Sequence, residues 1–143
     1  MVVVSKHALL RRRVAACALL GVALFCACSD LTEPLPPIQG TYSYVSSSLV
    51  PRLDRRGTIT IVDFDRRTAR FEGTFQFVDA DGDNRTGTLI GAFIQRDRIW
   101  FRFLDERQLY HEGDFNPGLS SGEIFFLGLA YETTGATFSL FAR

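Results

Sequence analysis

The chain has 143 residues, with sixteen basic and sixteen acidic residues and a hydrophobic fraction of 46%. This length accommodates about one domain of ordinary size. Four of the basic residues and none of the acidic ones precede Cys28, so the rest of the chain is mildly acidic and has no basic cluster, which argues against nucleic acid as a partner.

The first 28 residues have the layout of a secretory signal peptide. Lys6 and Arg11–Arg13 form a positive region, an apolar run over residues 14–25 follows, and small Ala27 stands directly before Cys28. The apolar run is too short to span a bilayer stably. The close of the segment resembles a bacterial lipobox, in which the cysteine after the cleavage site is lipidated and becomes the mature N-terminus.

We therefore predict a lipoprotein signal peptide over residues 1–27, with Cys28 as the lipidated residue that anchors the protein in the membrane. Ser29, and not Asp, follows this cysteine. In the lipoproteins that the segment resembles, this favours the outer membrane, with the protein facing the periplasm or the surface. An ordinary cleaved signal peptide and an uncleaved N-terminal anchor are the alternatives.

Few catalytic groups remain once the signal is removed. Two of the three cysteines and one of the two histidines lie within the signal, and Lys6 is the only lysine. With Cys28 blocked by lipid, His111 is the one remaining candidate for acid–base chemistry near neutral pH. Such a chain can build no cysteine nucleophile, Schiff base or Cys/His zinc site, so we expect a non-enzymatic protein without a cofactor or a metal.

Residues 28–37 form the predicted lipidated N-terminus and a tether. Pro34, Pro36 and Pro37 rule out a helix or a central strand here and favour extended polyproline geometry. From Ile38 onward apolar and polar residues alternate, so we place the folded domain at residues 38–143.

Period-two alternation dominates this domain. Over Thr68–Phe77, Phe71, Phe75 and Phe77 fall on one face and polar residues on the other, which is typical of a strand with one buried face. No segment outside the signal shows helical spacing. The predicted strands are Gly40–Ser47, Gly57–Phe64, Thr68–Phe77, Thr86–Gln95, Arg98–Phe103, Gln108–Phe115, Gly122–Tyr131 and Thr137–Leu140.

Short polar links such as Asp65–Arg67, Arg96–Asp97 and Asp105–Arg107 join these segments. Tight links join antiparallel neighbours, and a long meander usually closes to remove its exposed edges. The sequence therefore predicts an all-β domain, an eight-stranded antiparallel up-and-down barrel. A two-sheet sandwich and an outer-membrane barrel are the alternatives, and the lipobox and tether favour a soluble domain over the latter.

Gly40-Thr41-Tyr42 opens the first predicted strand after the proline-rich tether. Together with the lipobox and the strand rhythm, this motif resembles the small bacterial lipocalin-like lipoproteins, whose domain opens with Gly-x-Tyr or Gly-x-Trp. The resemblance covers most of the chain. It implies a lipocalin-like barrel that carries or senses a small apolar molecule and has no catalytic residue.

The inward-facing residues decide whether such a barrel has room for a ligand. An eight-stranded interior is either filled by side chains or able to hold one small ligand. The alternative to a ligand carrier is a solid barrel whose outer apolar residues, among them Trp100, Leu104 and Phe125–Leu129, dock an envelope protein. The candidate ligand-lining residues are Tyr42, Tyr44, Phe71, Phe75, Phe77, Phe93, Phe101, Phe103 and Phe126. The other inward-facing residues are Ile59, Ile61, Leu89, Ile99, Leu109, Ile124, Phe138 and Leu140.

Asp79-Ala80-Asp81-Gly82-Asp83 is similar to the start of a calcium-binding loop. In such a loop Gly and Glu would stand where this chain has Asn84 and Ile90. We therefore interpret the segment as an acidic, solvated hairpin tip, with weak calcium binding as the alternative.

His111 lies beside Glu112 and suggests acid–base work, but on a strand the two side chains face opposite sides. We expect a lone, partly buried histidine. Arg52, Arg55 and Arg56 form a basic segment, which we interpret as a solvated loop, with contact to a phosphate or a lipid headgroup as the alternative.

Overall fold

The computed structural model of the protein describes residues 34–48, 53–127 and 132–143. The predicted signal peptide over residues 1–27, Cys28, the start of the tether, Arg52 and Leu129 lie outside these ranges. Within them, no helix is both long and apolar enough to cross a membrane.

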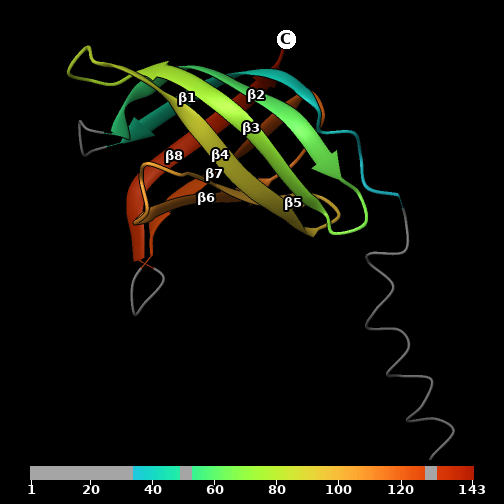
Figure 1. Cartoon of the computed structure of the whole chain (residues 1–143). Helices are drawn as coiled ribbons and strands as arrows, with labels where there is room; N and C mark the ends of the chain where they lie inside the picture. Colours follow the sequence, from blue (N-terminus) through green and yellow to red (C-terminus); the bar gives the residue numbers. More distant parts are fainter. Residues whose placement is uncertain (1–33, 49–52, 128–131) are drawn as a thin grey trace, which may run out of the picture. The chain divides into compact units, whose positions relative to one another are not determined.

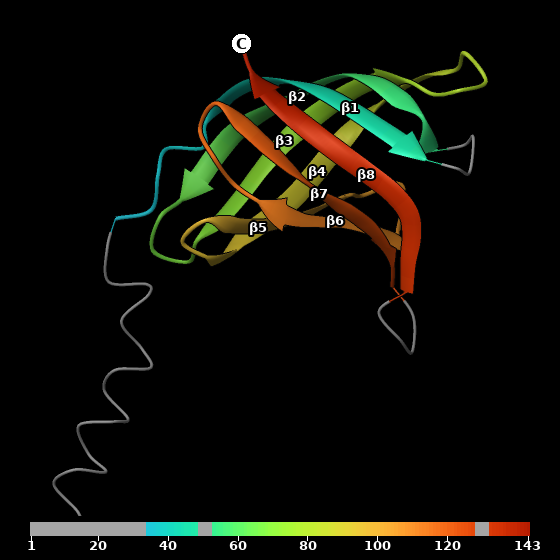
Figure 2. The same cartoon turned by 180° about the vertical axis from the view of Figure 1, so that it is seen from behind.

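Eight antiparallel strands form a closed barrel (Figures 1 and 2). They are β1 (Gly40–Ser48), β2 (Arg55–Asp65), β3 (Arg70–Val78), β4 (Asn84–Gln95), β5 (Arg98–Phe103), β6 (Leu109–Asp114), β7 (Leu119–Phe126) and β8 (Glu132–Ala142). Each strand pairs with its neighbour in sequence, and β1 pairs with β8 to complete the circle, as Figure 2 shows from behind. The predicted up-and-down barrel is confirmed, and the sandwich is not formed.

Some strand bounds differ from the prediction. β3 begins at Arg70 because Thr68 and Ala69 belong to the preceding turn, in which Ala69 adopts a left-handed φ of 59°. The carboxylate of Asp65 stabilises this turn by accepting hydrogen bonds from the backbone N–H of Arg67 (2.9 Å) and the hydroxyl of Thr68 (2.8 Å). β2 begins at Arg55, two residues earlier than predicted, so Arg55 belongs to a strand of the barrel and is buried.

The predicted inward face is the observed core. Of the inward-facing residues that the sequence predicts, all are buried except Leu109 and Phe126. Leu109 is partly buried and packs against the core, whereas Phe126 is 46% exposed. Phe126 is the last residue of β7, beyond an irregularity in the β7–β8 pairing at Ile124 and Phe125, so it lies at the end of the barrel and outside the packed interior.

Two aromatic residues of β3 pack over glycines of β4. Phe71 is the register partner of Gly91, and Phe75 is the partner of Gly87. A Cβ atom built on Gly87 would lie 2.8 Å from the Phe75 ring, and one on Gly91 would overlap the Phe71 ring. Glycine at these two positions leaves room for the rings, which cover the exposed backbone in return.

The segment before β1 closes one end of the barrel. Ile38 is fully buried and Leu35 is 8% exposed, and both belong to the same core cluster as the strand residues. The hydroxyl of Tyr42 donates a 2.7 Å hydrogen bond to the carbonyl of Ile38 and fixes this segment against β1. The compact unit begins at Pro34, so the end of the predicted tether packs with the barrel.

The alternation of β3 predicts that substitutions at two neighbouring positions lower the free energy of unfolding by very different amounts. Phe75 lies 4.3 Å from Phe103 and 5.0 Å from Phe77 between ring centroids, whereas Gln76 is exposed. Phe75→Ala should lower the free energy of unfolding by about 3–5 kcal/mol. Gln76→Ala should change it by less than about 0.5 kcal/mol. A denaturant titration of both variants measures these costs, and similar losses at the two positions would contradict the assignment of faces.

Candidate functional site

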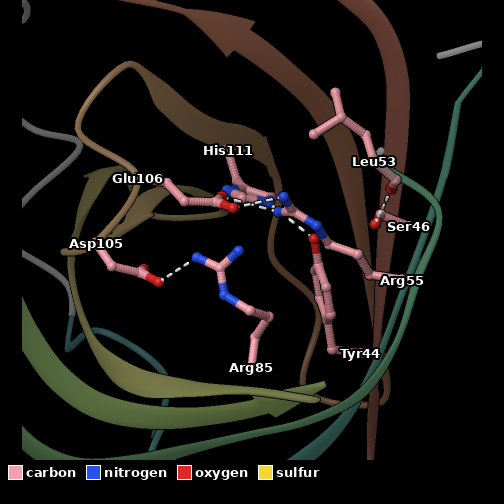
Figure 3. A network of polar contacts seen from close by, with 8 residues as sticks. All are labelled: Tyr44, Ser46, Leu53, Arg55, Arg85, Asp105, Glu106 and His111. Carbon is pink, nitrogen blue, oxygen red and sulfur yellow. Dashed lines mark hydrogen bonds and ion pairs between the residues drawn. The ribbon is translucent and has the colours of Figure 1, made fainter. Parts of the chain in front are cut away.

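A buried ion pair lies across the end of the barrel opposite the N-terminal closure. Arg55, the first residue of β2, reaches to Glu106 in the link between β5 and β6 (Figure 3). Its Nη1 donates to Oε2 at 2.9 Å and its Nη2 donates to Oε1 at 2.5 Å. The exposed fractions of the two side chains are only 5% and 12%, so this two-pronged pair forms largely out of water.

The guanidinium of Arg55 lies over an aromatic ring. Its central carbon lies 4.8 Å from the ring centroid of Phe77, in a cation–π contact. Leu53, which is 6% exposed, is held beside it by a hydrogen bond of 2.5 Å from the hydroxyl of Ser46 to the Leu53 carbonyl. These residues cover this end of the barrel interior.

A second polar contact lies within the barrel interior. The hydroxyl of Tyr44 and Nε2 of His111 are 2.9 Å apart, and both side chains are fully buried (Figure 3). The imidazole of His111 stacks on Phe101 at a centroid distance of 4.3 Å and an interplanar angle of 11°. Phe103 and Phe138 contact it edge-on at 5.0 and 5.3 Å. Three aromatic rings therefore contact the imidazole of this pair.

Burial keeps both partners of this pair uncharged. It lowers the pKa of His111 to about 3, and the positive charge of Arg55 acts in the same direction, while a backbone contact with Phe101 raises the pKa slightly. Burial also raises the pKa of Tyr44 to about 12. Neither group titrates near neutral pH, so the pair is suited to hydrogen bonding and not to acid–base catalysis.

Two buried nitrogen atoms at this site do not meet the geometry of a hydrogen bond. Nδ1 of His111 and Nε of Arg55 are both buried and make no hydrogen bond of good geometry. A buried polar atom without a partner costs stability unless another group satisfies it.

The candidate ligand-lining residues pack against one another. Eight of the nine are buried, and the rings of five of them, Tyr44, Phe75, Phe77, Phe101 and Phe103, contact one another. Phe77 lies 5.3 Å from Phe103, and Tyr44 lies 5.7 Å from Phe103 and 5.9 Å from Phe77 between centroids. The ninth, Phe126, lies at the rim opposite Leu109 in the β6–β7 register.

A groove of about 470 Å³ lies on the outer face of the barrel. Its lining combines aromatic, aliphatic and charged side chains, from Ile94, Trp100, Arg102, Tyr110, Glu112 and Leu127. Of the outer apolar residues that the sequence predicts, Trp100 lies in the groove, and Phe125 stacks on Tyr110 at 5.3 Å. Leu104 and Leu127 are exposed by 42% and 49%.

The three sequence motifs have structural roles. The carboxylate of Asp79 accepts hydrogen bonds from the backbone N–H groups of Asp81 (3.1 Å) and Asp83 (3.0 Å), which shapes the hairpin tip between β3 and β4. In the described ranges, no group of three or more His, Cys, Asp or Glu side chains could hold a metal ion. His111 is fully buried and not partly buried, and Glu112 faces away from it and pairs with Arg98 at 2.9 Å.

The interpretation of Arg55 as part of a solvated loop is wrong. Arg55 shares strand parity with Ile59 and Ile61, so its side chain points into the barrel, whereas Arg56 points out and is exposed. The sequence predicts Glu106 only as part of the polar link Asp105–Arg107, and not as the partner of Arg55. Extending the alternation of β2 back from Ile59 would have identified Arg55, but no local signal identifies its partner.

Comparison with known proteins supports the fold. No family model and no curated protein matches this chain. Among solved structures, a redesigned β-barrel superposes with a TM-score of 0.56 at 11% identity, covering 74% of this chain and 91% of its own. A β-barrel bound to DFHBI gives a TM-score of 0.55 at 12% identity and covers 74% and 94%. A de novo designed fluorescence-activating β-barrel gives 0.50 at 15% identity and covers 74% and 94%. At these identities the likeness shows the β-barrel fold.

The depressed pKa of His111 predicts acid sensitivity. The unfolded chain binds a proton on this residue below about pH 6.5, whereas the folded chain does not until about pH 3. The free energy of unfolding that the neutral His111 contributes is therefore complete above pH 6.5. It is lost as the pH falls toward 3, by at most about 1.4 kcal/mol per pH unit. His111→Gln should show a flatter pH dependence in denaturant titrations. Parallel curves for the two proteins would contradict the neutral, buried state.

Proposed function

We propose that this protein is a non-enzymatic lipoprotein of the cell envelope that binds a small apolar ligand at the Arg55–Glu106 end of its barrel. The observation that carries the proposal is the construction of this end. The hydrogen-bonded pair of Tyr44 and His111 and the ion pair of Arg55 and Glu106 lie among aromatic rings. Apolar side chains alone would be a simpler way to fill this end of a barrel.

The polar groups at this end match the composition of small-molecule sites. Such sites are lined by apolar and aromatic side chains and contain a few polar groups that orient the ligand. Tyr44, His111 and Arg55 supply those groups here, and Phe77 and Phe103 supply the apolar walls. The barrel that was solved with DFHBI shows that a barrel of similar architecture accommodates a small molecule.

Attachment to the membrane through Cys28 is part of this proposal and rests on the lipobox-like close of the signal segment. Stable anchoring requires more than one acyl chain, as a lipidated N-terminal cysteine provides. The segment from Pro34 packs with the barrel, so residues 29–33 would link the lipidated cysteine to the folded domain.

Lipidation can be tested directly. Cells expressing the wild-type chain should incorporate a radioactive fatty acid into it, and Cys28→Ser should abolish the label and leave the protein unprocessed or released from the membrane fraction. Cys26→Ser is the matched control and should keep the label. Wild-type protein without label would contradict the anchor.

Ligand binding can be tested with naphthylmethanol, a neutral aromatic probe. The full chain in lipid nanodiscs should bind it saturably with a stoichiometry of one, as measured by calorimetry against empty nanodiscs. Phe103→Trp should weaken binding because the larger ring takes up room among the inward-facing rings that it contacts, and Leu127→Ser on the outer face should have no effect. The reverse pattern would contradict an interior site.

The packed interior and the outer groove favour a second candidate, an interaction lipoprotein with a solid core. In that case the groove beside Trp100 and the exposed Leu127 would dock another envelope protein. The same calorimetric experiment distinguishes the two, because a solid barrel would bind naphthylmethanol only in a way that Leu127→Ser changes.

A further inference from the structure

The partner of Arg55 determines which class of ligand this end of the barrel can accept. A guanidinium presents its N–H donors in a rigid planar fork that fits a carboxylate with two parallel hydrogen bonds. In this structure Glu106 provides that carboxylate. Arg55 is 5% exposed, and removing its anion without a replacement would leave a buried charge unpaired.

Glu106 is placed so that its side chain can be exchanged for another carboxylate. Its own N–H donates to the Phe103 carbonyl at 3.1 Å, and its carbonyl accepts from the Leu109 N–H at 3.1 Å, so the backbone of the link is held independently of Arg55. Rotation of the side chain alone would bring Glu106 into water. If a second carboxylate then occupied the Arg55 fork, the net charge of the buried site would be unchanged.

The rim beside Glu106 offers apolar contacts for the rest of such a molecule. Leu109 begins β6 directly after the β5–β6 link, and its register partner Phe126 is 46% exposed. Register partners on adjacent strands point to the same side of a sheet. Leu109 packs against the core, so Phe126 lies on the interior side at the mouth of the barrel.

We propose that the ligand is an apolar monocarboxylate whose carboxylate displaces Glu106 from Arg55, with its apolar body against Phe126, Leu109 and Phe77. This inference rests on the proposed function and names its ligand class. The side chain of Glu106 acts as an internal competitor that keeps Arg55 paired while the site is empty.

The experiment compares naphthoate with naphthylmethanol, which share an aromatic body and differ in the carboxylate. Calorimetry on the full chain in nanodiscs should show naphthoate binding about tenfold more tightly, since hydrogen bonds to charged groups are stronger than neutral ones. Glu106→Gln weakens the internal competitor and should tighten naphthoate binding by about fivefold or more, with little change for naphthylmethanol.

Two further variants separate recognition from folding. The double variant Arg55→Gln/Glu106→Gln removes both charges together and leaves no buried charge unpaired, so it should fold, bind naphthylmethanol and lose the preference for naphthoate. Asp105→Asn is the matched control. Asp105 lies in the same link as Glu106, and the change breaks its exposed ion pair with Arg85 of β4 (2.7 Å; Figure 3). It should leave the affinity for naphthoate unchanged.

The outcomes distinguish this inference from the proposed function. Equal affinities for the two probes, or no gain with Glu106→Gln, would overturn the carboxylate exchange while leaving an apolar site in place. A preference for naphthoate that survives in the double variant would also overturn it. Binding of neither probe to the wild-type chain or to Glu106→Gln would overturn both.

Discussion

The pairing of β1 with β8 closes the sheet and forces one face of every strand into a shared interior. In a closed barrel of this size, each inward residue must pack against residues of other strands. The large aromatic residues satisfy this demand by contacting one another, as Phe75, Phe77 and Phe103 do, and glycines of β4 leave room for the rings of β3.

The same closure decides how the inward polar residues are satisfied. Water cannot hydrate a group inside the packed interior, so each needs a partner from another strand or link. Tyr44 of β1 finds His111 of β6, and Arg55 of β2 finds Glu106 across the barrel end. These two contacts join segments more than fifty residues apart in the chain. Their position at one end, opposite the apolar closure by Ile38, makes the barrel asymmetric.

This asymmetry is the basis for the proposed function. At one end Leu35, Ile38 and Tyr42 form a closure of apolar contacts and one hydrogen bond. At the other, the charged pair of Arg55 and Glu106 is largely buried, with Arg55 over the ring of Phe77. Replacing a buried ion pair with apolar residues is often neutral or stabilising, so retaining one is more readily explained by recognition than by stability. The proposed ligand, an apolar molecule with one acidic group, would keep Arg55 paired with an anion.

The sequence by itself determined the all-β class, the number of strands and nearly all of the core, because side chains alternate strictly along a strand and each alternation can be seen locally. It also identified His111 and Glu112 as facing opposite sides. It predicts Arg55 only as part of a basic loop, because the segment before Gly57 is a cluster of charges, and only the alternation of β2 extended back from Ile59 places Arg55 on the inward face. Only the tertiary structure decided that Arg55 meets Glu106, that His111 is enclosed by rings and that Phe126 lies at the rim. Those facts depend on which strands become neighbours across the barrel and on where each strand ends.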